Sequence, residues 1–248
     1  MDLYYEVNGK GHPVVLVTGG ADVRNWTFVT SLLAKHYKVV AFDGRGTGKS
    51  PSPLEDVNHV EDLLSLLDHL DINQATLIGH SMGGQIATEF ALDYPERVSN
   101  LVLLAPGLSG FSYSKEFEEK IKAVHEAAPD IDKMVELLIS DPSYRVVTGS
   151  PHRNLMVQML RHHMSRMFEW PAVKIILSQP PAIERLGELT AKTLLIIGKE
   201  DSPDNLRVAN YFRNHSDAQI IEIPDADHML NLTHPEKLYQ QIIGFMKE

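Results

Sequence analysis

The chain has 248 residues, a length that suits one large α/β domain or a core domain with an insertion. It contains no cysteine, which excludes disulfides, zinc–thiolate sites and a thiol nucleophile. Its formal net charge of −10 disfavours nucleic acid and anionic membranes as partners, because both are polyanions. The first residues lack a signal-peptide pattern, and no apolar run approaches the roughly 18 residues that span a bilayer. We therefore expect a soluble, cytoplasmic protein that acts on a small molecule, with its oligomeric state left open.

Short apolar runs alternate with helix-like segments through the first hundred residues. Five runs have the pattern of strands, at 3–7, 14–17, 39–42, 75–78 and 101–104. Amphipathic stretches with a helical period lie among them, at about 25–35, 56–70 and 84–94. Strand, helix and strand at this spacing predict parallel β-α-β units with right-handed crossovers.

The alternation stops between residues 106 and 189, where no run has the pattern of a buried strand. Helix-like segments occupy this stretch instead, at about 114–126, 130–140, 152–168 and 172–179. Strands return at 193–197 and 219–223, and a closing helix is predicted over 235–246. The pattern predicts an α/β core, residues 1–105 and 190–248, with a mostly parallel sheet and helices on both faces. Residues 106–189 are predicted to form a helical cap or lid.

The strongest motif is Gly79-His80-Ser81-Met82-Gly83, which follows a predicted strand and opens a predicted helix. A G-x-S-x-G sequence in that setting is typical of a nucleophile elbow. The glycines are needed because a strand that turns sharply into a helix brings the two backbones nearly into contact. Such a turn strains the serine backbone and presents the hydroxyl of Ser81 at the top of the sheet. The motif therefore predicts that Ser81 is a nucleophile.

With this motif the chain resembles the α/β-hydrolase superfamily, in particular its esterase/lipase, haloperoxidase-like and enol-lactonase-like group. The resemblance covers nearly the whole chain and depends on four segments, at 79–83, 43–50, 198–201 and 227–228. Their order and spacing are specific for the superfamily but not for a substrate. The resemblance implies an α/β-hydrolase fold and a triad in the chain order serine, acid, histidine.

A serine hydroxyl needs a base to remove its proton, and the chain has twelve histidines. The triad order places the base after the last strand, which selects His228. His215 precedes that strand, and His234 is expected at the start of the closing helix.

The acid must orient the imidazole and stabilise its charged form. The G-x-x-D spacing that the superfamily shows after a strand selects Asp201 within 198–201. Glu200 is the competing carboxylate, and Asp227 is disfavoured because it directly precedes His228.

Acyl transfer also needs two backbone N–H donors for the developing oxyanion. One is expected from Met82, the residue after the nucleophile. The other is expected from the loop after the strand 14–17, where Gly20 is the first choice and Ala21 the alternative. Relatives usually have His-Gly in this loop, whereas this chain has Thr18-Gly19.

The predicted cap is rich in methionine, and its spacing between 156 and 167 is helical. Met156, Met159, Met167 and Trp170 are candidates for the substrate pocket, although packing of a cap helix on the core explains the same spacing. His162 and His163 are interpreted as a solvated face or as residues of the pocket rim. No pattern of metal ligands and no cofactor motif occurs in the sequence, so neither a metal nor a cofactor is expected.

These residues predict a serine hydrolase that cleaves a small carboxylic ester, lactone or thioester through an acyl-enzyme. A C–C bond hydrolase or lyase with the same triad is the second enzymatic interpretation. A ligand sensor that keeps the triad but acts through a partner protein is an interpretation from a different class, which negligible turnover would distinguish.

Overall fold

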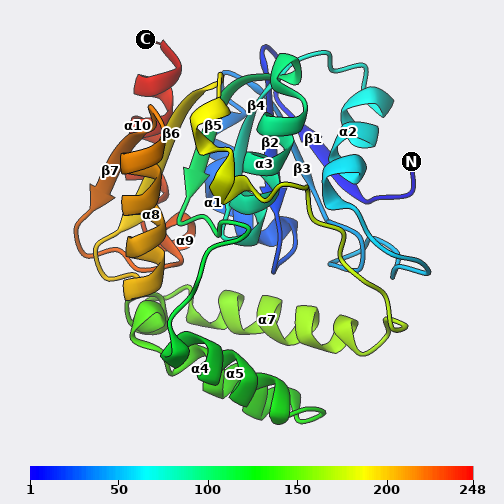
Figure 1. Ribbon diagram of the computed structural model, residues 1–248, viewed down its shortest axis with the longest axis vertical. Helices are drawn as coiled ribbons and strands as arrows, with labels where there is room; N and C mark the ends of the chain where they lie inside the picture. Colours follow the sequence, from blue (N-terminus) through cyan, green and yellow to red (C-terminus); the bar gives the residue numbers. More distant parts are fainter. Residues whose placement is uncertain (248) are drawn as a thin grey trace.

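The computed structural model describes residues 1–247, which form a seven-stranded sheet in the order β1-β3-β2-β4-β5-β6-β7 (Figure 1). All neighbouring strands are parallel except β1, which pairs antiparallel with β3 at one edge. The strands are β1 (Tyr5–Asn8), β2 (Pro13–Thr18), β3 (Lys38–Phe42), β4 (Ala75–His80), β5 (Val98–Leu104), β6 (Lys192–Gly198) and β7 (Gln219–Ile223). The predicted fold class, a mostly parallel sheet with helices, is therefore confirmed.

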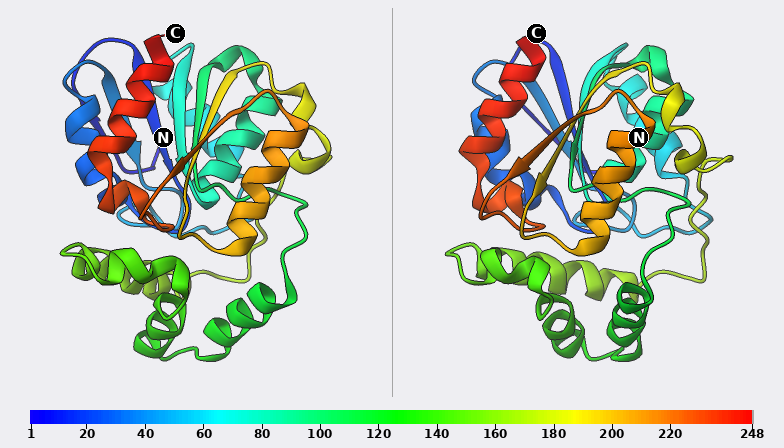
Figure 2. Two further views of the ribbon diagram at one scale, coloured as in Figure 1. Left: turned by 90° about the vertical axis from the view of Figure 1, so that its left-hand side faces the viewer. Right: turned by 60° about the vertical axis from the view of Figure 1, so that its left-hand side comes forward.

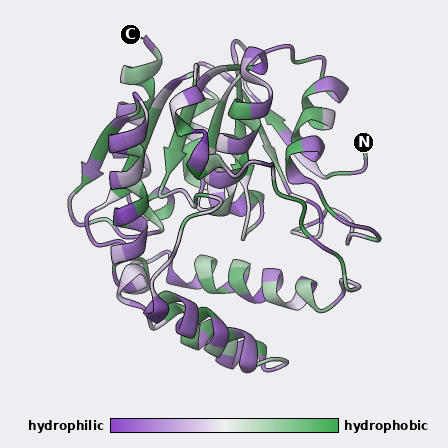
Figure 3. Cartoon of the chain, viewed as in Figure 1, coloured by the Kyte–Doolittle hydropathy of each residue, from purple (hydrophilic) through white to green (hydrophobic). Residues whose placement is uncertain are grey.

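The central strands are continuous apolar runs because helices cover both faces of the sheet. Val14–Val17 in β2 and Leu101–Leu104 in β5 are buried along their whole length. Figure 3 shows the hydrophobic strands at the centre of the molecule, with hydrophilic residues mostly on the outer faces of the helices.

The helices of the core lie in two layers, one on each face of the sheet (Figure 2). On one face α1 (Thr27–Leu33) packs against α10 (Pro235–Lys247). On the other face lie α2 (His59–His69), α3 (Met82–Asp93) and α8 (Pro203–His215). The sequence pattern did not indicate α8, although Ser202 caps its first turn and Pro203 is its first residue, both of which are helix-start signals. Within residues 1–247, no helix is long and apolar enough to cross a membrane.

The chain between β5 and β6 contains four further helices, which lie beyond the carboxyl ends of the strands (Figures 1 and 2). They are α4 (Lys115–Glu126), α5 (Ile131–Ile139), the short α6 (Arg145–Thr148) and α7 (Arg153–Met167). Their positions agree with the helices expected at 114–126, 130–140 and 152–168. The role of this segment as a lid stays a prediction.

The helix expected at 172–179 does not form. This segment is extended, because Val57 donates its N–H to the Lys174 carbonyl and accepts from the Ile176 N–H. The segment has prolines before and after it and contains β-branched residues, which favour an extended backbone. The segment therefore runs beside the loop before α2 and leads the chain back to the core.

Candidate active site

Ser81 lies in a strained turn between β4 and α3. Its φ of 54° and ψ of −121° are outside the regions that L-residues ordinarily adopt. A Cβ on Gly83 would lie 2.0 Å from the Val17 carbonyl oxygen, and one on Gly79 would lie 2.4 Å from the Gly83 oxygen. The glycines of the motif are therefore required by close contact between β2, β4 and the start of α3.

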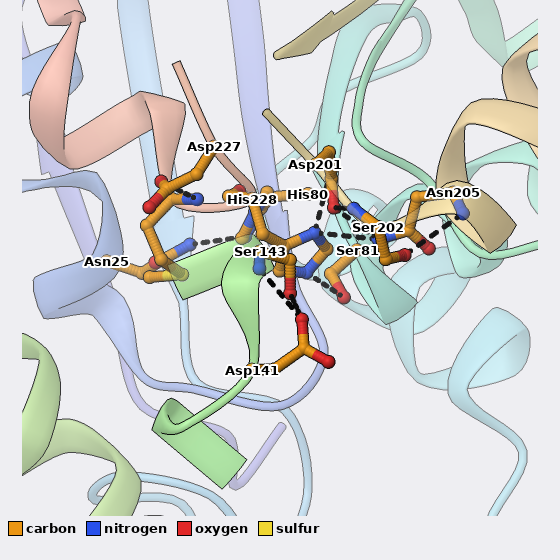
Figure 4. A network of polar contacts seen from close by, with 11 residues as sticks. Asn25, His80, Ser81, Asp141, Ser143, Asp201, Ser202, Asn205, Asp227 and His228 are labelled. Carbon is orange, nitrogen blue, oxygen red and sulfur yellow. Dashed lines mark hydrogen bonds and ion pairs between the residues drawn. The ribbon is translucent and has the colours of Figure 1, made fainter. Parts of the chain in front are cut away.

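Three side chains from three different loops form one line of hydrogen bonds (Figure 4). The Nε2 atom of His228 lies 3.1 Å from the Ser81 Oγ, and its Nδ1 atom lies 3.1 Å from an Asp201 carboxylate oxygen. His228 follows β7, and Asp201 follows β6. The fold thus brings together the serine, histidine and aspartate that the sequence selected, at distances suited to proton transfer.

The competing carboxylates lie elsewhere. Glu200 points outward and forms an ion pair of 2.6 Å with Arg145. Asp227 accepts hydrogen bonds from the backbone N–H groups of Val147 and Met229, so it joins the His228 loop to α6. Of these three carboxylates, only that of Asp201 lies within hydrogen-bond distance of the His228 imidazole.

The carboxylate of Asp201 is itself held by two donors. Its other oxygen accepts hydrogen bonds of 2.7 Å from the Ser202 backbone N–H and from the Asn205 side-chain amide. Asn205 lies in the first turn of α8, the helix that the sequence pattern did not indicate. Asn205 is therefore a supporting residue that sequence reasoning missed.

A second buried histidine supports the main chain of the His228 loop. The Nε2 atom of His80 donates to the His228 carbonyl at 2.8 Å, and its Nδ1 atom accepts from Asn25 at 3.3 Å. Asn231 in turn donates to the Asn25 side chain and carbonyl (Figure 4 shows Asn25 and His80). Burial lowers the pKa of His80 to about 3, so its imidazole is neutral and one nitrogen is free to accept. Sequence reasoning missed this residue, although it lies inside the motif.

The environment of His228 has two opposing effects on its pKa. Burial alone lowers the pKa, but the charge of Asp201 and the hydrogen bond to it outweigh burial and raise the pKa above its usual value. The imidazolium that forms when His228 accepts a proton is therefore stabilised by Asp201.

This shift predicts the pH dependence of the activity. Because only unprotonated His228 can accept a proton, kcat/KM should be low in acid and rise with pH. The rise should follow one proton, with its midpoint above about 6.5 because the pKa is raised. Kinetics of the free enzyme between pH 5 and pH 9 measure the midpoint. A rise centred well below pH 6, or one abolished by EDTA, would contradict the assignment.

The predicted oxyanion donors lie on adjoining backbone segments. A Cβ on Gly19 would lie 2.4 Å from the Met82 Cβ, so the loop after β2 packs directly on the start of α3. Gly20 and Ala21 both line the cavity beside Ser81. Thr18 stands where relatives usually have a histidine. The loop accommodates this threonine, because the Thr18 hydroxyl accepts a hydrogen bond from the indole N–H of Trp26.

A mainly apolar cavity of about 280 Å³ adjoins Ser81 and His228. The core contributes the loop after β2, and the helices between β5 and β6 form most of the opposite wall. Six methionines line it, namely Met134, Met156, Met159, Met164, Met167 and Met229. Three of the four pocket residues expected from the sequence, Met156, Met159 and Met167, are in this wall.

The fourth expected pocket residue, Trp170, does not line the cavity. The chain turns after α7 ends at Met167, and the indole of Trp170 packs on the loop after β3. A Cβ on Gly46 would lie 2.3 Å from a ring carbon of Trp170, which shows how close this contact is.

The two adjacent histidines of α7 differ in their surroundings. The Nε2 atom of His162, which is exposed, bonds to the carbonyl of Gly48, whereas His163, which is only partly exposed, lines the cavity. Of the two positions expected for this pair, the solvated face therefore does not describe His163. The helical period places two neighbours about 100° apart, so one of the pair can face inward.

A second, more polar compartment of about 250 Å³ meets the first at the serine. Its lining includes Gln85, Asn205 and the ion pair between Lys120 and Asp141, whose charged atoms lie 2.6 Å apart. Ser81, Tyr144 and His228 line both compartments. Ser81 therefore lies where an apolar and a polar space adjoin.

The sheet has this topology, the serine lies in a strained turn after β4, and a histidine lies beside it. Together these features are typical of one class of protein. The chain belongs to the alpha/beta hydrolase family, whose model matches residues 14–241.

Individual relatives are diverse. The chain is 29% identical over 255 residues to the "dihydrolipoyllysine-residue acetyltransferase component of acetoin cleaving system" of Pseudomonas putida, covering 99% of this chain and 66% of that protein. It is 30% identical over 272 residues to a "2-hydroxy-6-oxononadienedioate/2-hydroxy-6-oxononatrienedioate hydrolase" of Paraburkholderia xenovorans (strain LB400), covering 99% and 91%. A solved hydrolase from Pseudomonas aeruginosa PA01 matches the fold with a TM-score of 0.81 at 24% identity, covering 99% and 94%.

Proposed function

We propose that the protein is a serine hydrolase that cleaves a small carboxylic ester, lactone or thioester through an acyl-enzyme. The observation that supports this proposal best is the unbroken series Ser81–His228–Asp201 with both hydrogen bonds at 3.1 Å. The series lies at the junction of two cavities, so a substrate can place its two parts on either side of Ser81.

The proposed reaction begins when the Ser81 Oγ attacks the substrate carbonyl and His228 accepts the serine proton. The backbone N–H groups of Met82 and Gly20 stabilise the oxyanion that forms. His228 then donates its proton to the leaving group, which departs and leaves the acyl group on Ser81. A water molecule, deprotonated by His228, hydrolyses the acyl-enzyme and restores the serine. Asp201 orients the imidazole in both halves of the reaction.

The helices between β5 and β6 act in this proposal as the lid of the site. Their side chains form the apolar wall opposite Ser81, and a methionine-rich wall adapts to flexible apolar groups. Exclusion of water by such a wall strengthens the electrostatic interactions of the triad. A volume of about 280 Å³ limits the apolar part of the substrate to a small molecule.

A second candidate function, hydrolysis of a carbon–carbon bond, is favoured by the relative from Paraburkholderia xenovorans. The oxo-dioate named for that protein has no ester or amide bond, so its hydrolysis breaks a bond between two carbons. The polar compartment with Lys120 would suit an acidic part of such a substrate.

A single panel of substrates separates these functions. It contains p-nitrophenyl esters with two to ten acyl carbons, small lactones, thioesters and a vinylogous 1,5-diketone. We expect turnover of esters with medium-length acyl chains, unaffected by EDTA and absent in Ser81→Ala. Turnover of the diketone alone would favour the carbon–carbon hydrolase. Absence of any turnover, with ligand binding retained, would instead favour a sensor.

A further inference from the structure

His163 is the one strongly polar side chain of the α7 wall of the apolar cavity. Its neighbours in that wall are apolar, including Met159, Leu160 and Met164. It lies on α7, and the loop after β2 and Ser81 line the same cavity. An imidazole that lines the cavity is within reach of a substrate bound there.

Neither ring nitrogen of His163 has a hydrogen-bond partner among residues 1–247. The Nδ1 atom is fully buried and unpaired. Buried polar groups in folded proteins are nearly always paired, so an unpaired one calls for a specific explanation. The adjacent His162 shows the ordinary outcome, because it bonds to the Gly48 carbonyl at 3.1 Å. A ligand cannot reach the buried Nδ1 atom, so Nε2, which is not among the buried unpaired atoms, is the nitrogen of His163 that is available to a ligand.

The chemistry around His163 limits what that ligand can be. Burial lowers the pKa of His163 to about 4, so its imidazole is neutral near pH 7. Asp22, the acid whose charge acts on His163, is already engaged by two hydrogen bonds from the Arg24 guanidinium. With no cation on this wall, a substrate carboxylate would be desolvated without compensation. A neutral imidazole has one donor and one acceptor, and an uncharged oxygen can pair with the donor.

We propose that His163 determines specificity by donating a hydrogen bond to a hydroxyl or keto oxygen on the apolar arm of the substrate. The preferred substrate then has a medium-length hydrocarbon chain with one uncharged oxygen substituent, away from the bond that is cleaved. The inference rests on the proposed hydrolase function and adds the substrate class to it. His163 takes no part in proton transfer.

The test compares kcat/KM for p-nitrophenyl octanoate with kcat/KM for a series of its keto and hydroxy derivatives. The members of the series differ in the acyl-chain carbon that carries the added oxygen. Wild-type protein should prefer one oxygenated isomer, and His163→Leu should reduce this preference by about 10- to 100-fold. His163→Gln, which keeps a donor and an acceptor, should retain part of it. His162→Leu is the matched control and should leave the preference unchanged. An equal preference in wild type and His163→Leu overturns the proposal.

Thermal unfolding separates this role from a structural one. Leucine removes an unpaired buried polar group from apolar surroundings, so the Tm of His163→Leu should be equal to or above that of wild type. A clear fall in Tm would indicate that His163 stabilises the fold, and would contradict the proposal.

Measurements of ligand binding test the role of His163 independently of whether the protein hydrolyses esters. Ser81→Ala is titrated by calorimetry with an alkyl methyl ketone and with hydroxylated ketones of the same chain length. Tighter binding of one hydroxylated ketone, lost on adding His163→Leu, supports the inference even if no ester is hydrolysed. Equal binding of all the ketones overturns it even if esters are hydrolysed.

Discussion

Ser81→Ala is expected to lower kcat by about 10⁴-fold or more, because it removes the hydroxyl that is proposed to form the covalent intermediate. The fold should be unchanged. The Ser81 Oγ bonds only to His228 among residues 1–247, and alanine keeps the same Cβ in the strained turn. Steady-state kinetics on the best ester of the panel, together with Tm, measure both effects.

Substrate affinity provides the control for this variant. The cavity walls do not change, so Ser81→Ala should bind a substrate ester without converting it. A variant that folds and binds but retains wild-type turnover would exclude Ser81 as the nucleophile.

Asp201→Asn is expected to lower kcat by up to about 10⁴-fold, the loss seen when the aspartate of another serine triad is replaced in this way. An amide cannot stabilise the charged imidazolium, and it favours the wrong tautomer of His228. Because Asp201 lies behind His228 and away from both cavities, KM should change little. The midpoint of the pH profile should also fall, since the negative charge that raises the pKa of His228 is gone.

Glu200→Gln is the matched control, one residue away and with the same change of charge. Glu200 is partly exposed and pairs with Arg145 across the surface, so its loss should alter kcat less than about twofold. If Glu200→Gln were the damaging change and Asp201→Asn the mild one, the assignment of the acid would be reversed.

The strands and the elbow could be predicted because local sequence determines them. A buried parallel strand must be a continuous apolar run, and a strand-to-helix turn in contact with its neighbours must use glycine. The extended form of the segment 172–179 was signalled only weakly by its prolines and β-branched residues, since it also depends on pairing with Val57, more than a hundred residues away. Helix α8 was not predicted because its start is marked by the cap at Ser202 rather than by an apolar run.

In the site, too, some residues could be identified from local sequence, whereas the roles of others depend on the tertiary structure. Ser81, Asp201 and His228 were selected by motif, spacing and chain order, and the structure brings their side chains together. His162 and His163 were assigned together to a solvated face or to the rim, because the sequence does not show which face of α7 lies toward the cavity. His80 was overlooked, since its role depends on a carbonyl 148 residues away.

Ser81 is proposed to form a covalent intermediate, and mass spectrometry of the protein, first intact and then as peptides, tests this most directly. The protein is treated with a p-nitrophenyl alkylphosphonate, digested, and the modified peptide is sequenced. We predict one phosphonate per chain, attached to Ser81 and absent in Ser81→Ala. Labelling should be slowed strongly in His228→Ala, because the base that activates the serine is missing. Attachment at another residue, or no attachment while ester hydrolysis is inhibited, would contradict the serine mechanism proposed for this protein.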